Sequence, residues 1–275
     1  MTQPAVTFQI KQLEEHFNTR LFERGHGRIA LTAAGLVVLD YAERILSMSA
    51  ELDIRLKEMT GQIAGLLLVG ASTTIAEFLL PQTLGEFKSK YPLVSPRLVV
   101  ANSGAVESRV AEHTLDIGFI ESPSHLPTIV SDVCCEDELQ VVCAPSHALA
   151  KLKSVMPKQL VQYPVIIRES GSGTREVTDM YLEKEGVRLD SLNVVMELGS
   201  PEALKGLVAT GLGYAIMSRT AVLKETRLGQ LVRIPLSPPL IRNLSVVYPK
   251  EKFRSRLVNT FVQFAKERLA VPLEA

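Results

Sequence analysis

The sequence predicts an α/β protein in which a long helix precedes two doubly wound α/β lobes. From Leu66 onward, short runs rich in Val, Ile and Leu alternate with helical stretches, and these runs lack strict apolar and polar alternation. Strands buried on both faces of a sheet have this pattern, and the helices between them supply parallel crossovers. Residues 33–62 instead contain no proline and repeat apolar side chains at spacings of three and four. A length of 275 residues allows about two domains.

The first segment of the chain is predicted to be an amphipathic helix. Apolar side chains recur along one face at positions 6, 10, 13 and 17. Thr2 suits the N-cap and Pro4 the first turn. Thr2, Gln3, Thr7 and Lys11 fall on another face, where their side chains are able to bond base edges and phosphates. A solvated surface helix has the same pattern, so periodicity alone leaves both interpretations open.

Residues 33–62 carry the pattern of a coiled-coil seam. The apolar spacing alternates between four and three over three heptads, which favours pairing with a second chain. The alternative is a single amphipathic helix packed on its own domain. Gly61 and Gly65 indicate a short hinge into the next domain. The seam consists of Val38, Ala42, Ile45, Ser49, Leu52, Leu56, Met59 and Ile63.

Eight strands are predicted after the hinge, and four of them run into short hydroxyl or glycine residues that begin a helix. Ligands of open α/β sheets bind beyond the carboxyl ends of strands, where helix N-termini offer free N–H groups to anions. Ordinary helix capping explains each position separately, whereas the set, together with two arginines, favours a small-anion site. The strands are residues 66–70, 96–101, 116–120, 139–144, 165–168, 194–198, 214–217 and 244–248. The candidate site residues are Ser72, Thr73, Thr74, Asn102, Ser103, Arg168, Ser170, Gly171, Ser172, Gly173, Thr174, Arg175 and Ser200.

The N-terminal motifs give this pattern a family. TQPAVTFQIKQLEE at residues 2–15, LFER at 21–24, a basic glycine turn at 25–28 and LTAAG at 31–35 resemble the DNA-binding module of LysR-type transcriptional regulators. The resemblance implies a recognition helix and a wing of a winged helix-turn-helix. It implies that Thr2, Gln3, Pro4 and Thr7 face the major groove, and that Lys11, Arg24, Arg28 and Thr32 contact phosphates or the minor groove. The helices that precede the recognition helix in that family are missing, so we expect Met1 to be an internal methionine of a longer protein.

The resemblance also implies the domain plan. It places a partial winged helix-turn-helix at residues 1–35, a linker and dimerisation helix at 36–63, and an effector-binding domain at 64–275 that is similar to periplasmic binding proteins. Lobe I is expected at about 66–162 plus 244–275, and lobe II at about 163–243. Within the linker, Val38, Ala42, Ile45, Leu52, Leu56 and Met59 are the expected dimerisation residues.

RESGSGTRE at residues 168–176 resembles an element of the branch that regulates sulfur assimilation and carbon dioxide fixation. GFIE at 118–121, DEL at 137–139 and MELGSPEA at 196–203 fit the same branch. The branch implies a sulfur oxyanion or a phosphorylated metabolite as effector. The hydroxyl-rich helix ends suit a compact anion, which favours the sulfur oxyanion.

Composition and motifs argue against other classes. Thirty basic and 30 acidic residues balance, so the DNA assignment depends on the motif and not on charge. The longest apolar run is shorter than the roughly 20 residues of a membrane span, and no export leader is visible. Enzyme motifs such as HExxH or GxSxG are absent, and no metal or cofactor is expected. The Gly211 and Gly213 pair is better explained by a helix C-cap and a tight turn than by a dinucleotide fingerprint.

Cys134, Cys135 and Cys143 lack metal-ligand spacing, so we interpret them as reduced thiols, with a redox sensor using the vicinal pair as the alternative. Together these observations predict a cytoplasmic, LysR-type transcriptional regulator that binds promoter DNA as a homodimer or homotetramer. Analogy favours activation. A stand-alone small-anion binding module without DNA binding is the competing hypothesis.

Overall fold

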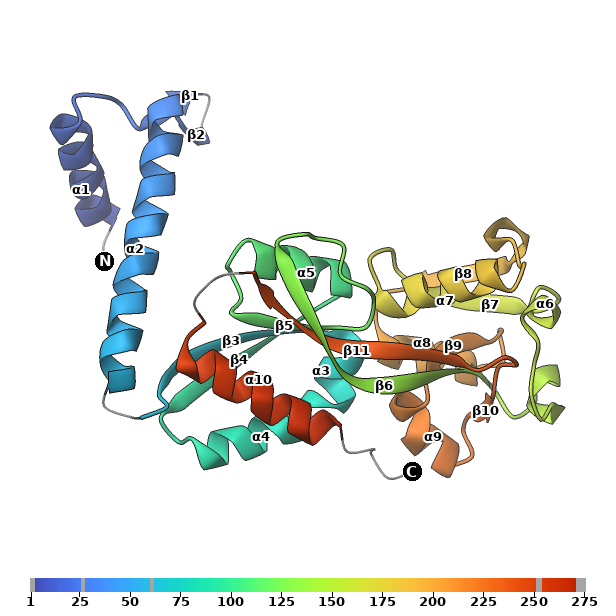
Figure 1. Ribbon diagram of the computed structural model, residues 1–275. Coiled ribbons are helices and arrows are strands. Elements are labelled where there is room, and N and C mark those ends of the chain that lie inside the picture. Colours follow the sequence, from blue (N-terminus) through green and yellow to red (C-terminus); the bar gives the residue numbers. More distant parts are fainter. Residues whose placement is uncertain (1–2, 26–27, 60–61, 251–253, 271–275) are drawn as a thin grey trace. The chain divides into compact units, whose positions relative to one another are not determined.

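The computed structural model describes residues 3–25, 28–59, 62–250 and 254–270, and the chain divides into two compact units, Met1–Gln62 and Ile63–Ala275. The first unit contains helix α1 (Gln3–His16), strands β1 (Phe22–Gly25) and β2 (Arg28–Leu31), and helix α2 (Ala33–Met59) (Figure 1). The two strands form an antiparallel hairpin in which Phe22 pairs with Leu31 and Gly25 with Arg28. A helix, a hairpin and a long helix are therefore the elements of this unit.

Local polar contacts and one close backbone approach connect α1, the hairpin and α2. Glu14 on α1 accepts hydrogen bonds from the backbone N–H groups of Leu21 (2.7 Å) and Phe22 (3.2 Å). Thr32 donates to the carbonyl of Arg20 (2.7 Å) and accepts from the N–H of Gly35 (2.9 Å). A Cβ at position 35 would lie 2.1 Å from the carbonyl oxygen of Leu21, so only glycine fits there.

The second unit is built on one long mixed sheet and one short parallel sheet. The long sheet has the order β10-β6-β11-β5-β3-β4, with β9 paired to β6, and the short sheet pairs β7 with β8. Its strands are β3 (Gly65–Ser72), β4 (Val94–Ala101), β5 (Ile117–Ile120), β6 (Ile129–Cys143), β9 (Ala215–Ser218), β10 (Val232–Ile234) and β11 (Leu240–Pro249), and the short sheet contains β7 (Pro164–Arg168) and β8 (Asn193–Leu198).

The second unit has two lobes, and in each of them helices cover a group of strands. Lobe I contains α3 (Thr73–Phe78), α4 (Leu80–Lys90), α5 (Ser103–Ala111) and α10 (Arg256–Leu269) on β3, β4 and β5. Lobe II contains the remaining helices on β7, β8 and β9: η1 (Ala148–Lys151), α6 (Pro157–Leu160), α7 (Gly173–Lys184), η2 (Leu189–Ser191), α8 (Pro201–Ala209), η3 (Thr220–Val222) and α9 (Leu223–Arg227). Strands β6 and β11 run antiparallel through both lobes (Figure 1). The two α/β lobes predicted from the sequence are present.

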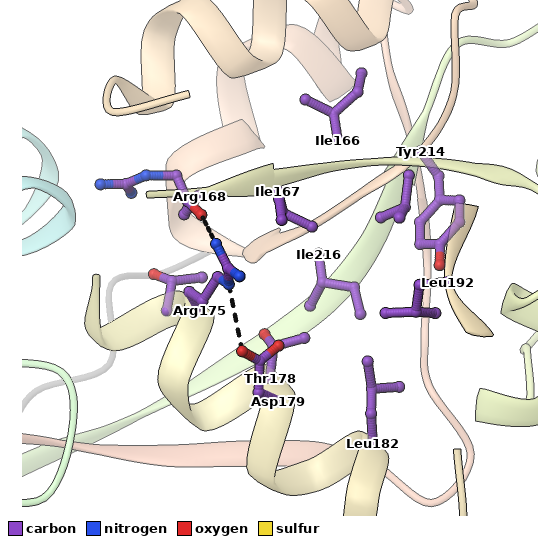
Figure 2. Close-up of a pocket in the computed structure, with 12 residues that line it drawn as sticks. Ile166, Ile167, Arg168, Arg175, Thr178, Asp179, Leu182, Leu192, Tyr214 and Ile216 are labelled. Atoms are coloured by element: carbon purple, nitrogen blue, oxygen red, sulfur yellow. Dashed lines mark hydrogen bonds and ion pairs between the residues drawn. The ribbon is translucent and has the colours of Figure 1, made fainter. Parts of the chain in front are cut away.

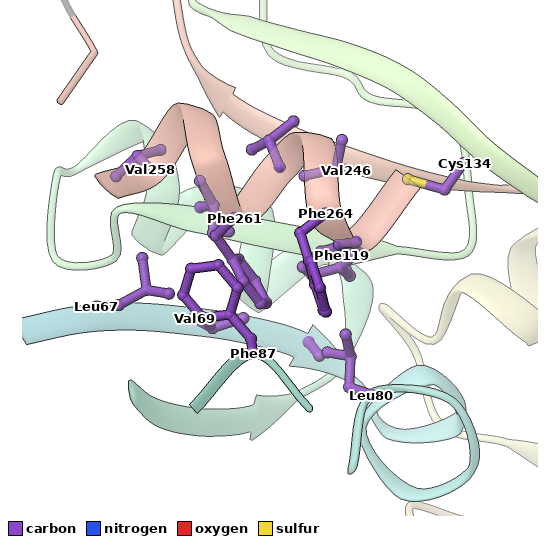
Figure 3. Packing of buried hydrophobic residues seen from close by; sticks show 14 of the residues in the cluster. Leu67, Val69, Leu80, Phe87, Phe119, Cys134, Val246, Val258, Phe261 and Phe264 are labelled. Atoms are coloured by element: carbon purple, nitrogen blue, oxygen red, sulfur yellow. The ribbon is translucent and has the colours of Figure 1, made fainter. Parts of the chain in front are cut away.

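Each lobe has its own apolar core. In lobe I, the Phe87 ring packs edge-on against Phe261 and Phe264, with centroids 4.8 and 5.3 Å apart (Figure 3). Phe119 on β5 approaches Phe261 from the sheet side at 6.3 Å. In lobe II, the fully buried Tyr214 packs among aliphatic side chains of β6, β7 and α7. The lobes are therefore separate packed bodies joined by the crossing strands.

The structure corrects two of the predicted strands and adds one. The strand predicted at 139–144 is the C-terminal end of β6, which begins ten residues earlier, and the strand predicted at 244–248 lies within β11. The sequence pattern predicts short parallel strands at both places, whereas β6 and β11 pair antiparallel with each other over most of their length. Polar residues such as Asp132 and Glu136 interrupt the apolar run of β6, so an apolar-run criterion truncates it. β10, with three residues, was not predicted.

Candidate functional site

Three of the predicted site residues cap, through a side-chain hydrogen bond, helices that begin beyond strand ends. Asn102 accepts a hydrogen bond from the N–H of Ala105 (2.9 Å) at the start of α5. Ser172 accepts from Arg175 N–H (3.4 Å) at α7, and Ser200 accepts from Ala203 N–H (3.3 Å) at α8. These side chains therefore perform the ordinary capping function that the sequence left as the alternative. Capping does not exclude an anion site, because the other N–H groups of each first turn have no partner within their helix.

The loop between β7 and α7 lies against lobe I. The N–H of Gly104 donates to the carbonyl of Gly171 (3.3 Å), and the Asn102 amide donates to the carbonyl of Ser170 (3.4 Å). Gly171 has a φ of +83°, a conformation that favours glycine. A Cβ on Gly173 would lie 2.5 Å from the Ser103 hydroxyl. Predicted residues from distant parts of the sequence are thus brought together where the lobes meet.

Arg168 reaches from the end of β7 to lobe I. Its side chain is 5% exposed, and Nη2 donates to the Thr73 hydroxyl of lobe I (3.0 Å) and to the carbonyl of Gly199 (3.3 Å). The same guanidinium forms a two-pronged ion pair with Glu169, through Nε (2.9 Å) and Nη2 (3.1 Å). Arg168 is therefore a buried cation at the lobe junction whose charge is compensated by its neighbour in sequence.

Arg175 has different surroundings from Arg168. Its Nη1 donates to the Arg168 carbonyl (2.9 Å) and to Glu197 (2.8 Å), and its Nε donates to Asp179 (3.3 Å). Burial raises the pKa of Asp179, and the Arg175 charge opposes that rise. Figure 2 shows Arg175 between the Arg168 carbonyl and Asp179, while the Arg168 side chain points away. The two arginines that the sequence grouped therefore face different surroundings.

Thr174 belongs to a buried polar network that the sequence did not reveal. Its hydroxyl donates to Glu121 (2.7 Å) and accepts from Arg242 Nη1 (2.9 Å). Arg242 also forms an ion pair with Glu121 and donates through Nε (2.9 Å) and Nη2 (2.7 Å) to Asp137, which accepts a further bond from Ser218 (2.7 Å). The network joins the end of β5, the start of α7, the end of β9 and both crossing strands.

The charges of this network are held by mutual pairing. Burial would raise the pKa of Glu121, but the Arg242 guanidinium and the hydroxyls of Ser72, Thr174 and Thr74 hold it below its usual range. The pKa of Arg242 is raised by Glu121 and Asp137 against the effect of burial. Removing one member of such a group leaves an uncompensated buried charge. The only sequence signals for it are Glu121 and Asp137 in the motifs quoted above, and Arg242 had none.

Ser72 is a buried residue of the predicted site whose side chain does not cap its helix. Its hydroxyl is buried and has no hydrogen-bond partner of good geometry among the described residues, and α3 begins without a side-chain cap. Thr74 is also buried, and Ser103 accepts a hydrogen bond from the N–H of Glu121 (3.3 Å). The Ser72 hydroxyl therefore lies beside Glu121 and leaves the N-terminus of α3 without a side-chain cap.

Lobe II contains a small cavity (Figure 2). Its volume is about 30 Å³. Aliphatic side chains, mainly of β7, form half of its lining, and Arg168, Thr174 and Arg175 of the predicted site also border it. The hydroxyls of Tyr214 and Thr178 border it, and both lack hydrogen-bond partners within the part of the chain that the structure describes. This volume is large enough for an ordered water. It is too small for a metabolite.

A larger hollow of about 790 Å³ lies over the crossing strands. It is bordered by residues 134–138 of β6, by Ile241 and Leu244 of β11, and by parts of α4, η3, α9 and α10, and it includes none of the predicted anion-site residues. Burial raises the pKa values of Cys134 and Cys135 to about 11, which disfavours the thiolate that redox sensing needs. Among the described residues, no cluster of three potential ligands is arranged to hold a metal ion.

The predicted DNA-contacting residues have varied surroundings. Gln3 and Pro4 are exposed at the start of α1, Thr7 donates to the carbonyl of Gln3 (3.0 Å), and Lys11 pairs loosely with Glu15 (3.6 Å). Thr32 is the cap of α2 described above. Thr2 and the side chains of Arg24 and Arg28 lie outside the described residues. Val6 and Leu13 on the apolar face of α1 are exposed.

The predicted dimerisation residues fall on α2, whose described side chains leave large apolar groups in solvent. Val38 and Ala42 are half-buried, whereas Ile45 and Leu52 are 64% and 56% exposed. The side chains of Leu56 and Met59 lie outside the described residues. No helix in the described ranges has the length and apolar character required to cross a membrane.

Comparisons with known proteins agree on the class of molecule. The family described as bacterial regulatory helix-turn-helix protein, lysR family, matches residues 1–36, and the LysR substrate binding domain family matches residues 60–270. A probable RuBisCO transcriptional regulator of Porphyra purpurea is 33% identical over 269 residues, which cover 96% of this chain and 84% of that protein. A protein of the same description from Nostoc is 33% identical and covers 99% of this chain and 82% of its own length.

Solved structures give the same result. The Synechocystis PCC6803 CcmR regulatory domain in complex with 2-PG is 27% identical, with a TM-score of 0.68, and covers 74% of this chain and 96% of that domain. HinK, a LysR family transcriptional regulator from Pseudomonas aeruginosa, is 22% identical, has a TM-score of 0.68, and covers 98% of this chain and 90% of that protein. At this identity the second likeness shows the fold alone.

Proposed function

The chain belongs to the LysR family of transcriptional regulators, and we propose that a phosphorylated metabolite, bound between the lobes of its effector-binding domain, controls its activity at promoter DNA. The observation that carries the proposal is the position of Arg168. This buried guanidinium reaches from lobe II to Thr73 of lobe I, close to the N-terminus of α8. An anion held there would interact with both lobes at once.

The nature of the anion follows from the relatives and the site together. The CcmR regulatory domain binds 2-PG, which is 2-phosphoglycolate, and the relatives from Porphyra and Nostoc are described as RuBisCO regulators. Two oxygens of a phosphate monoester can accept parallel hydrogen bonds from one edge of a guanidinium. The sequence favoured a sulfur oxyanion and placed the phosphorylated metabolite second. The comparison with CcmR supports the second assignment, and we adopt it.

The mechanism that we propose is a shift in lobe arrangement. A ligand with contacts to both lobes stabilises the lobe relation in which those contacts are made, and it does so only by its differential affinity for that relation. We propose that the change in lobe arrangement changes how the subunits pack. Because the effector-binding domain continues from the linker helix α2, this change in packing would alter the spacing of two DNA-binding units. We propose that the protein acts on promoter DNA in the cytoplasm as a homodimer or homotetramer.

Calorimetric titration of the full chain tests the ligand assignment. We expect 2-phosphoglycolate to bind more tightly than sulfate, sulfite or glycolate, and Arg168→Gln to weaken its binding about 100-fold because a charge-assisted two-pronged contact is lost. Arg188→Gln is the matched control, since Arg188 is an exposed arginine of lobe II that pairs only with Asp190 among the described residues. Equal affinities for the parent protein and Arg168→Gln would remove Arg168 from the site.

A further inference from the structure

The edge of the Arg168 guanidinium formed by Nε and Nη2 is already occupied by a carboxylate of the same chain. Both oxygens of Glu169 accept from the Arg168 guanidinium, at 2.9 and 3.1 Å. This is the two-pronged geometry with which a free carboxylate or phosphate binds arginine. The pair joins neighbours in sequence, so its formation requires no movement of the lobes.

We propose that Glu169 is an internal competitor of the effector, which a bound dianion must displace from Arg168. This inference rests on the proposed function, because it names the residue that sets the affinity of the same site. The displaced Glu169 carboxylate then points toward solvent, and the guanidinium edge that it occupied binds the phosphate or sulfate group of the ligand.

The surroundings of the two partners differ in the way that such an exchange requires. Arg168 is 5% exposed and is also held by Thr73 and the Gly199 carbonyl, so it stays in place when Glu169 leaves. The Glu169 side chain is 24% exposed, and among the described residues Arg168 is the side chain that donates hydrogen bonds to its carboxylate. When the carboxylate turns into water it is solvated, which offsets the loss of the ion pair, whereas release of Arg168 would expose a buried site.

Glu169 therefore sets a minimum affinity that an anion needs in order to bind at Arg168. When the binding-competent form of a site is only fractionally populated, the apparent dissociation constant rises by the inverse of that fraction. An internal carboxylate that occupies Arg168 about nine-tenths of the time thus weakens every anion about tenfold. Monoanions that make the same contact as Glu169 fall below useful affinity, while a dianion with further contacts to helix N-termini still binds. Glu169 would in this way keep abundant weak anions out of the site.

Titration calorimetry with inorganic sulfate, inorganic phosphate and acetate tests this inference on the full chain. We expect Glu169→Gln to bind all three anions about tenfold more tightly than the parent, and Glu169→Asp to fall between them because its shorter side chain pairs less well with Arg168. Glu176→Gln is the matched control. It removes a carboxylate from the first turn of α7 that pairs with His125 and not with Arg168, and its affinities should stay within about twofold of the parent.

The outcomes separate this inference from the proposed function. Unchanged or weaker anion binding by Glu169→Gln, with binding that still depends on Arg168, would show that Glu169 only orients Arg168, and the competitor role would be wrong. A gain in Glu176→Gln equal to that in Glu169→Gln would assign the effect to net charge and would also overturn it. Absence of 2-phosphoglycolate binding in the parent and in the Glu169 variants would contradict the proposed function itself. A crystal structure with sulfate should show the Glu169 side chain turned away from Arg168, and an intact pair would contradict the inference.

Discussion

At the scale of single residues, the structure distinguishes two threonines of α7, one in the predicted site and one outside it, by the hydrogen bonds that their hydroxyls make. Thr174 makes two buried hydrogen bonds to charged groups, whereas the Thr178 hydroxyl, one helical turn further along α7, has no partner among the described residues. Both positions are threonine, so the sequence alone does not distinguish them. Their contribution to stability is set by what the fold places beside them.

This contrast gives a matched pair of substitutions. We expect Thr174→Val to lower the free energy of unfolding by about 1 to 3 kcal/mol, because it leaves Glu121 and Arg242 each short of a buried hydrogen bond. Thr178→Val should change it by less than about 0.5 kcal/mol or raise it, since an unpaired hydroxyl is replaced by a methyl group. Urea denaturation measures both, and equal losses in the two variants would argue against the network.

The three cysteines give a second prediction at this scale. Burial raises the pKa of Cys134, Cys135 and Cys143 from 9.0 to about 11. At about pH 8 the thiolate fraction is then about a hundredfold smaller than for an unperturbed thiol. Alkylation by iodoacetamide of the native protein should be slower by about that factor than in concentrated guanidinium chloride. Rapid modification of Cys134 and Cys135 in the native state would revive the redox-sensor alternative.

At the scale of elements, the structural role of the N-terminal unit is clearest where α1, the hairpin and α2 meet. Glu14 ties α1 to the first strand, and Gly35 allows α2 to approach the Leu21 carbonyl. These two residues lie within or beside the family motif, and both act on the internal geometry of the unit. Glu14 and Gly35 are thus distinct from the residues expected to contact DNA, whereas Thr32 belongs to both groups.

Gly35→Ala tests this junction. A Cβ at 2.1 Å from the Leu21 carbonyl forces the backbone apart, so we expect weaker DNA binding and earlier thermal unfolding of the N-terminal unit, by several degrees. Gly85→Ala on α4 is the control, because nothing lies within 4 Å of its Cβ position and alanine favours a helix by about 0.8 to 1.0 kcal/mol over glycine. A harmless Gly35→Ala would mean that the junction is not tightly packed in solution.

The exposed apolar side chains of α2 give the other prediction at the element scale. In a paired linker helix, Leu52→Asp together with Leu56→Asp would place charges in the apolar seam. We expect the double variant to shift the mass measured by light scattering toward the monomer and to alter the gel-shift pattern on promoter DNA. Substitution of Arg44, an exposed residue of the same helix that pairs with Asp40, by Ala should leave both unchanged. An unaltered oligomer in the double variant would remove these residues from the interface.

At the scale of the whole molecule, the buried network of Glu121, Asp137 and Arg242 links the two lobes to both crossing strands. It carries two negative charges and one positive charge away from solvent, and its integrity depends on Glu121 remaining ionised. It joins segments up to 121 positions apart in the sequence, so we expect it to couple the stability of one lobe to that of the other. Thr174, a residue of the predicted anion site, is itself a member of the network.

This coupling predicts a dependence of stability on pH. The folded pKa of Glu121 lies below its unfolded value, so its stabilising contribution is fully present above about pH 4.5 and is lost as the pH falls through the folded pKa. Urea denaturation between about pH 7 and about pH 3 should show this loss. Glu121→Gln should be less stable at neutral pH and should lose less stability on acidification than the parent. Parallel pH profiles for the two proteins would exclude Glu121 as a source of the dependence.

The sequence by itself determined the family, the α/β class of the second unit and the polar residues that follow several strands. The comparisons and the structure confirm the family and the fold class. These features are local: apolar period, capping chemistry and motif order are written in contiguous residues. The lengths of β6 and β11 were underestimated, because a strand that crosses between lobes alternates burial and carries polar residues on its open face.

Only the tertiary structure decided which site residues are free and which are paired. Arg168 and Arg175 lie seven positions apart in one motif, yet one reaches lobe I and the other pairs with lobe II carboxylates. Arg242 is 68 residues from Thr174 and 121 from Glu121, so no local pattern could connect them. Hydrogen bonds and ion pairs depend on distances of about 3 Å between groups that the fold brings together. Such distances arise from packing, and for that reason the pairing of charges had to come from the folded chain.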